Sequence, residues 1–188
     1  VTLVAHSNGG LLAKAIVLKL EEIGKEDLID KIVFLASPQL GTPKAIGTIL
    51  HGYDQEVGGG WVVDDQVARR VVNKLPGAYY LLPSVKYFDL NNGEPIVSFD
   101  QSSTTKFYRD RYGSDIIDYN EFVDFMSDIS VGARNLDSEV NEPAVANIGI
   151  LSDTVVKQTT LLDDWTAPLD IEIIEIVGTG LPTMKGVR

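Results

Sequence analysis

The sequence contains no cysteine, which excludes disulfide bonds and thiol chemistry and leaves the cellular compartment undetermined. It contains no apolar run of about eighteen residues, the length that a membrane-spanning helix requires, so we expect no transmembrane segment. Positive charge is also scarce, since 16 lysines and arginines against 27 aspartates and glutamates give a net charge of -11. Long-range repulsion therefore disfavours nucleic acids and anionic membrane surfaces as partners.

Sequence motifs that bind metals and nucleotides are also missing. Two pairs of carboxylates, at residues 64–65 and 163–164, have no histidine or cysteine at ligand spacing, and we interpret them as solvated acidic surface. Three glycines at residues 58–60 lack the Gly-Lys-Ser/Thr of a phosphate loop. The Gly-Thr-Gly at residues 178–180 lacks a third glycine at dinucleotide spacing. We expect no metal and no cofactor.

What the sequence does contain is an ordinary globular composition with the pattern of a parallel sheet. Its 188 residues are 44% hydrophobic and 23% charged, which is enough to bury the core of one domain with an insertion. Residues 1–5 and 32–36 are continuous apolar runs, typical of parallel strands covered by helices on both faces. Residues 171–177 place Glu172 and Glu175 on opposite faces, which indicates a strand nearer the sheet edge.

The first ten residues hold the most informative motif. An apolar strand pattern stops at Ala5 and a helical pattern begins at residue 11, so Ser7 lies at the tip of a sharp strand-to-helix turn, directly after His6. Such a turn strains the serine backbone, exposes its hydroxyl and aims helix N-terminal amides at the space beside it. Ala5 and Gly9 supply the small side chains that a close strand and helix require. We therefore predict Ser7 as a nucleophile and the Asn8 backbone amide as an oxyanion donor.

A helix is predicted to follow this turn over residues 8–23, with Gly24 as its stop signal. It connects the first two strands in a βαβ unit with a right-handed crossover. Its apolar face is assigned to Leu12, Ala15, Ile16, Leu20 and Ile23.

Three further segments accompany the Ser7 turn. They are Ala-Ser-Pro-Gln-Leu-Gly-Thr-Pro at residues 36–43, Leu-Pro-Gly-Ala-Tyr-Tyr-Leu-Leu-Pro-Ser at residues 75–84, and Gly-Thr-Gly-Leu-Pro-Thr at residues 178–183. Together with residues 5–14, they resemble the α/β-hydrolase superfamily and, within it, the lecithin:cholesterol acyltransferase-like lipases and acyltransferases. The resemblance implies an α/β fold class, part of an α/β-hydrolase parallel sheet with an inserted, mainly helical cap.

The resemblance also implies which parts of the site this chain supplies. In α/β-hydrolases the catalytic acid and histidine follow the serine in chain order. His6 adjoins Ser7 and is expected to point away from it, and His51 precedes any plausible acid. The resemblance therefore implies that the acid and base lie downstream of Arg188, and that earlier strands and the second oxyanion amide lie upstream of Val1. On this interpretation the chain is an incomplete fragment whose missing parts are its structural partners.

The domain organisation expected from these patterns has three parts. Residues 1–50 form a core segment with the nucleophile turn, residues 51–166 an inserted cap, and residues 167–188 a return to the core. Within the cap, residues 115–126 have the pattern of an amphipathic helix. An aromatic and apolar cluster in the cap either lines an acyl-chain pocket above Ser7 or packs the cap onto the core. This cluster consists of Tyr79, Tyr80, Leu81 and Leu82.

The function predicted from the sequence is that of a serine-dependent lipase, esterase or acyltransferase. Ser7 would form an acyl-enzyme with a carboxylic ester, and the lipid nature of that ester rests on the resemblance and on the apolar cap. The alternative is a noncatalytic binding or scaffold protein on the same fold, in which the turn persists as structure and Ser7 is unreactive.

Overall fold

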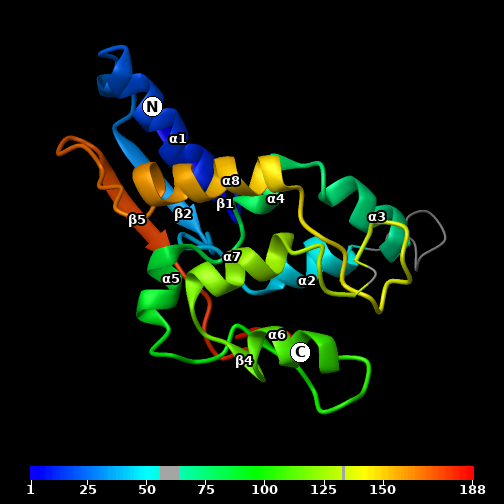
Figure 1. Cartoon of the computed structure of the whole chain (residues 1–188). Helices are drawn as coiled ribbons and strands as arrows, with labels where there is room; N and C mark the ends of the chain where they lie inside the picture. Colours follow the sequence, from blue (N-terminus) through cyan, green and yellow to red (C-terminus); the bar gives the residue numbers. More distant parts are fainter. Residues whose placement is uncertain (56–63, 133) are drawn as a thin grey trace.

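A computed structural model describes residues 1–55, 64–132 and 134–188 of the chain. Its main sheet has three parallel strands in the order β1-β2-β5, namely β1 (Thr2–His6), β2 (Lys31–Leu35) and β5 (Glu172–Ile176). Helix α1 (Gly9–Glu22) connects β1 to β2, and most helices lie between β2 and β5 in the sequence, to the right of and below the sheet in Figure 1. The predicted α/β class and parallel pairing are confirmed.

The segment between β2 and β5 is mainly helical. A small antiparallel pair, β3 (Val97–Ser98) with β4 (Asp115–Ile116), interrupts the helices. The helices are α2 (Lys44–His51), α3 (Asp65–Val72), α4 (Pro76–Tyr79), α5 (Val85–Leu90), α6 (Lys106–Tyr112), α7 (Tyr119–Ser127) and α8 (Ile148–Lys157), and α8 continues into the short helical segment η2 (Gln158–Leu162). A short helical turn, η1 (Glu26–Leu28), precedes β2. The predicted helix over residues 115–126 is therefore wrong in its first part, since β4 precedes α7, which begins where the Asp118 side chain accepts from the Glu121 amide.

Only one face of the three-stranded sheet is covered by the described residues. Ala5, Ile32 and Phe34 alternate along the strands, are at most 6% exposed and pack with α1 and Trp165. On the opposite face Val4 is 67% exposed. The expectation of helices on both faces is not met in the described part of the chain, because β1 and β5 are its two edge strands and α1 lies against one face. The edge position predicted for the third strand is confirmed.

Helix α1 buries a different face from the one predicted. Leu11, Ala13 and Val17 are its buried apolar side chains, whereas Leu12 is 62% exposed. Lys14 is buried among them, with its ammonium 5.5 Å from the centre of the Trp165 ring. The sequence pattern is apolar on most sides of α1, so packing against the sheet, rather than periodicity, selects the buried face.

A second hydrophobic core lies among the helices between β2 and β5. It joins Ile46, Ile49 and Leu50 of α2 to the buried side chains of later helices, including Phe122 and Phe125 of α7. Helix α2, which the sequence assigned mostly to the first 50 residues, therefore packs with the residues of the expected cap. Residues 56–63 and 133 of that predicted cap lie outside the described part.

Candidate active site

The backbone at Ser7 is strained at the point where β1 gives way to α1. Its φ angle is 53°, in the left-handed region that non-glycine residues rarely adopt. The Ser7 amide donates to the Leu35 carbonyl at 3.0 Å, and the Gly10 amide donates to the Ser7 carbonyl at 3.0 Å. These two bonds fix the turn between β2 and the first turn of α1. Such a residue costs about 1 to 3 kcal/mol and persists only where its surroundings hold it.

The close approach at this turn falls on Gly10. A Cβ atom built on Gly10 would lie 2.4 Å from Ser37 Oγ and 3.2 Å from the Phe34 ring, so a side chain does not fit. A Cβ atom on Gly9 would meet Ala5 Cβ at 3.9 Å, an ordinary contact. The steric requirement predicted for Gly9 is thus weaker than expected, and the second glycine of the Gly-Gly pair was the missed signal. Phe34 of β2, together with Ser37 after that strand, imposes the steric requirement at Gly10.

Asn8 follows Ser7 and is the residue that directly precedes α1. Its backbone amide has no hydrogen-bond acceptor among the described residues, which leaves it available to an oxyanion. Its side chain is engaged elsewhere, because Asn8 Nδ2 donates to the Gly77 carbonyl at 3.1 Å. This bond ties the turn to the start of α4, a segment that sequence reasoning did not connect with Asn8.

Residues of the loop after β2 make further contacts at the carboxyl ends of β1 and β2. The Ser37 hydroxyl donates to the Ala5 carbonyl at 3.3 Å. Gly41 has φ 89°, and a Cβ atom there would lie 2.1 Å from the Leu82 carbonyl oxygen. The Thr42 amide donates to the Leu81 carbonyl at 2.8 Å. The resemblance segments 36–43 and 75–84 therefore lie against each other, beyond the carboxyl end of β2.

Neither histidine of the chain is hydrogen-bonded to Ser7. Ser7 is half-buried, and its hydroxyl has no hydrogen-bond partner among the described residues. His6 is exposed at the end of β1. His51 lies at the end of α2, where its Nδ1 is 2.6 Å from the Val140 carbonyl oxygen. Burial lowers the pKa of His51, so its ring is neutral at physiological pH.

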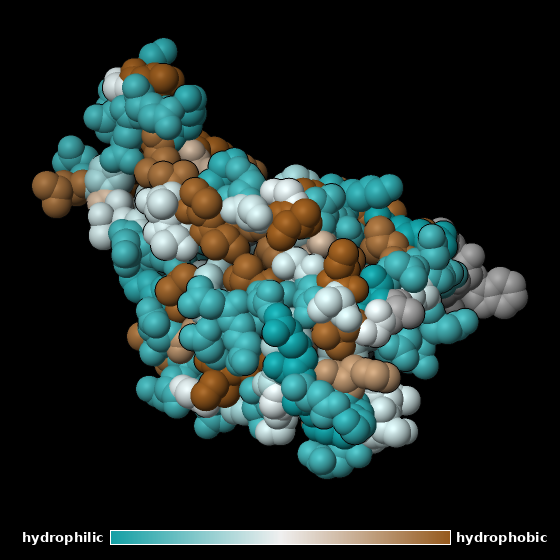
Figure 2. Space-filling model, in the orientation of Figure 1, coloured by the Kyte–Doolittle hydropathy of each residue, from teal (hydrophilic) through white to brown (hydrophobic). Residues whose placement is uncertain are grey.

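A groove of about 530 Å³ begins at the turn that follows Ser7, and we call it the elbow groove. Asn8 and Gly9 line one end, and it runs along the outer side of α1 toward α8. Figure 2 shows hydrophobic side chains gathered over this part of the molecule. Its other lining residues are Leu11, Leu12, Ala15, Leu18, Lys19, Glu22, Gly77, Tyr80, Lys157, Leu161 and Leu162.

The four predicted pocket residues occupy different environments. Tyr80 lines the elbow groove, and burial raises the pKa of its phenol. Tyr79 is fully buried in the second core, where its hydroxyl donates to the Asn73 carbonyl at 3.0 Å. Leu82 is 2% exposed in the same core, and the half-buried Leu81 packs against it. Only Tyr80 of the four lines a cavity that reaches Asn8.

The remaining chemistry of the described residues is limited. No three histidine, cysteine, aspartate or glutamate side chains come together as a metal site requires in the part of the chain that is described. Across residues 1–55, 64–132 and 134–188, every helix is too short or too polar to cross a bilayer.

Comparison with known proteins gives one family. The family model of lecithin:cholesterol acyltransferase matches residues 1–187 of the chain. Among solved structures, a chain in the crystal structure of the Tle4–Tli4 complex is 17% identical in sequence with a TM-score of 0.48. That alignment covers 92% of this chain and 35% of that chain. No curated protein matches the sequence.

Proposed function

The chain belongs to the lecithin:cholesterol acyltransferase family, and from this premise we propose that Ser7 is the nucleophile of a lipase, esterase or acyltransferase. The observation that carries the proposal is the strained φ of 53° at Ser7, on a strand-to-helix turn with a free amide at Asn8. Strain of this kind concentrates where a side chain has to be presented for chemistry. The family supports lipid acyl chemistry in general terms.

In the proposed reaction, Ser7 Oγ attacks the carbonyl carbon of a carboxylic ester and its proton passes to a base. The tetrahedral oxyanion accepts a hydrogen bond from the Asn8 amide and from a second donor. The bond from the carbonyl carbon to the alkoxy oxygen then breaks, the alcohol leaves with the proton, and an acyl-Ser7 ester remains. Water or a second alcohol releases the acyl group, which distinguishes hydrolysis from acyl transfer.

We propose that residues outside this chain supply the base, its acid and the second oxyanion donor. Two observations support this proposal. Neither His6 nor His51 is hydrogen-bonded to Ser7, and β1 leaves one edge unpaired within the described residues. Losing one oxyanion donor costs about 100- to 1,000-fold in rate, so the chain by itself is expected to be nearly inactive.

We further propose that residues 51–166 act as a cap and that the elbow groove receives the acyl chain. The groove starts at the oxyanion residue Asn8, is mostly apolar, and has a volume typical of ligand sites. Tyr80 and Leu161 contribute apolar walls on the side facing α1. A long acyl chain attached at Ser7 would therefore bury its methylenes along α1.

The test is ester hydrolysis by the full-length protein that contains this chain, with butyrate and decanoate esters of one chromogenic alcohol. We expect Ser7→Ala to abolish turnover of both esters and Ser37→Ala to retain it. Leu161→Trp narrows the groove and should raise KM for decanoate several-fold while leaving butyrate unchanged. Leu169→Trp, at a fully exposed position, is the matched control. A folded protein without turnover would favour the scaffold alternative.

A further inference from the structure

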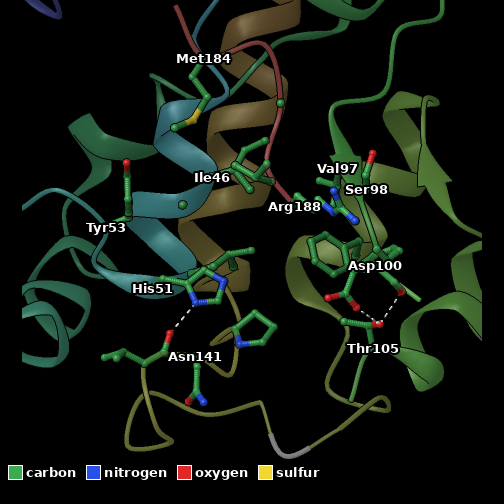
Figure 3. A pocket seen from close by; sticks show the side chains of 18 of the residues that line it. Ile46, His51, Tyr53, Val97, Ser98, Asp100, Thr105, Asn141, Met184 and Arg188 are labelled. Atoms are coloured by element: carbon green, nitrogen blue, oxygen red, sulfur yellow. Dashed lines mark hydrogen bonds between the residues drawn. The ribbon is translucent and has the colours of Figure 1, made fainter. Parts of the chain in front are cut away.

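A second cavity, of about 720 Å³, lies along α2 and shares no lining residue with the elbow groove. We call it the α2 cavity, and Figure 3 shows it from close by. Ile46 and His51 of α2 form one wall, Val97 and Asp100 the facing wall, and Met184 the end. Its size is within the range of small-molecule sites, and nothing in the proposed acyl chemistry uses it.

The wall formed by the C-terminal segment is fixed in place. The Val187 amide donates to the Ile96 carbonyl at 2.9 Å, and the Ser98 amide donates to the Val187 carbonyl at 2.9 Å. A Cβ atom on Gly186 would lie 2.8 Å from the Pro95 carbonyl oxygen, so this approach requires glycine. The α2 cavity is thus bounded by paired backbone rather than by a free chain end.

His51 supplies the unusual polar group of the α2 cavity. Its Nδ1 carries the proton that is donated to the Val140 carbonyl, at 2.6 Å, so Nε2 holds a lone pair. No described residue donates to Nε2, and Figure 3 shows that edge of the ring turned into the cavity. Burial lowers the pKa of His51, and the charges of Arg69 and Arg134 lower it further. The ring therefore presents a neutral hydrogen-bond acceptor.

The charged side chains that line the α2 cavity are of both signs, Asp65 and Asp100 against Arg188, so the lining does not select a charged ligand. A cation beside the His51 ring would also meet the charges of Arg69 and Arg134, which add to the effect of burial in lowering the pKa of His51. An anion would meet the Asp100 carboxylate, which already accepts from the Ser102 amide at 3.0 Å and the Thr105 hydroxyl at 2.8 Å. Arg188 lies on the Asp100 side and compensates this carboxylate. The remaining surface includes Ile46, Leu50, Phe99, Phe125, Met184 and Val187, which are apolar.

We propose that the α2 cavity is a second binding site that takes a neutral aliphatic alcohol. The hydroxyl of the alcohol donates to His51 Nε2, and its chain lies against Ile46, Phe99 and Met184. An uncharged group with one donor satisfies the acceptor without placing a charge between the guanidinium groups and Asp100.

The test measures binding of octanol by isothermal titration calorimetry to the full-length protein carrying Ser7→Ala, so that no acyl-enzyme forms. The methyl ether of octanol has the same chain but no donor hydroxyl, and we expect it to bind about five- to tenfold more weakly. Octylamine and octanoate are expected to bind more weakly than octanol. An ether or a charged analogue that binds as well as octanol would overturn the proposal.

Variants distinguish the two cavities. Met184→Trp fills the α2 cavity without removing any side-chain hydrogen bond among the described residues, and should reduce octanol affinity at least about tenfold. Leu181→Trp, in the same segment but 85% exposed, should leave the affinity unchanged. If Leu161→Trp in the elbow groove removes octanol binding instead, the alcohol lies beside Ser7 and the proposal is wrong.

His51→Phe provides the matching test of the acceptor. This variant keeps a ring of similar shape and should abolish the difference between octanol and its ether, with a thermal unfolding curve as the check of folding. Met184→Trp keeps the proposal testable if His51→Phe does not fold. All of these binding measurements use the Ser7→Ala protein. A failure to bind octanol would therefore overturn only the second site, and the ester hydrolysis assay tests the proposed acyl chemistry separately.

Discussion

Ser7 keeps a positive φ although it has a Cβ atom, and this strain is a cost that the turn imposes on the fold. A glycine at the same position adopts φ 53° without steric penalty. We expect Ser7→Gly to raise the free energy of unfolding by about 1 kcal/mol while it removes the nucleophile. Ser37→Gly is the control, because Ser37 has no positive φ and should lose stability. Urea unfolding of the full-length protein measures both, and a destabilised Ser7→Gly variant would contradict the interpretation of strain.

Gly41 shows the opposite situation, in which only glycine fits. Gly41→Ala would place a methyl group 2.1 Å from the Leu82 carbonyl oxygen at φ 89°. We expect a loss of about 2 to 4 kcal/mol in the free energy of unfolding. Gly178→Ala has open space around it and no positive φ, so it should change stability by about 0.5 kcal/mol or less. Equal effects of the two variants in denaturant titrations would show that the close contact is absent.

Sequence reasoning identified Ser7 and Asn8 at this scale because the strand-turn-helix pattern is local. It did not identify Gly10, whose neighbour Ser37 follows the next strand, or Gly77, whose carbonyl accepts from Asn8. Both contacts join segments far apart in the chain. A single sequence carries no local signal for such pairs.

At the scale of elements, Arg69 connects α3 to the loop before α8. Its side chain is fully buried, and its guanidinium donates to the carbonyls of Leu136, Ser138 and Glu142 among others. It forms no ion pair with a carboxylate in the part of the chain that is described. Arg69→Met should lower the free energy of unfolding by about 3 kcal/mol or more, because several buried carbonyls lose their donor.

Arg70 is the matched control for this substitution. It is on the same helix, and its ion pair with Asp137 at 2.7 Å is solvent-exposed. Arg70→Met should change the free energy of unfolding by about 1 kcal/mol or less. Chemical denaturation monitored by circular dichroism compares the two variants. If Arg69→Met left the free energy of unfolding unchanged, water would have to replace the guanidinium as the donor to these carbonyls, which would contradict the prediction.

Elements themselves were predictable in part. The strands and the extent of α1 follow from apolar runs bounded by turn residues, whereas the buried face of α1 does not, because Leu11 and Leu12 are equally apolar. The region over residues 115–126 has a helical pattern throughout, but its first two residues pair with β3. Tertiary contacts, and not the local pattern, decide both the buried face of α1 and the strand at β4.

At the scale of the whole molecule, the acidic balance makes stability depend on pH. Hydrogen bonds from Ser130, followed by the Tyr112 hydroxyl, lower the pKa of Asp128 to about 2, from an ordinary value near 3.8. A depressed folded-state pKa stabilises the protein above the unfolded value, and this contribution is lost as pH falls from about 4 to about 2. In the Asp128→Asn variant, the free energy of unfolding should therefore depend less on pH between about 4 and about 2.

Asp27→Asn, at an exposed position in η1, is the control for this prediction. Thermal unfolding is measured between pH 5 and pH 2, a range that brackets the ordinary aspartate pKa. The unfolding temperature should fall less steeply with decreasing pH for Asp128→Asn than for Asp27→Asn. Parallel curves for the two variants would indicate that Asp128 is not held by these hydrogen bonds.

The overall architecture was only partly accessible from sequence. The parallel sheet was predicted, and residues 167–188 were expected to return to the core through a strand, as β5 does. After β5, however, the chain continues to pair Val187 with Val97 beside the second core. This pairing closes the α2 cavity, and a pairing of two distant short segments has no signature in composition or periodicity.

The central claim is that Ser7 is an activated nucleophile, and covalent labelling tests it most directly. The full-length protein is treated with a fluorophosphonate probe, and the modified residue is located by mass spectrometry, with Ser7→Ala and Ser37→Ala as paired variants. The account predicts modification at Ser7, its loss in Ser7→Ala and its retention in Ser37→Ala. A folded protein that the probe leaves unmodified, or modifies equally in Ser7→Ala, would contradict it.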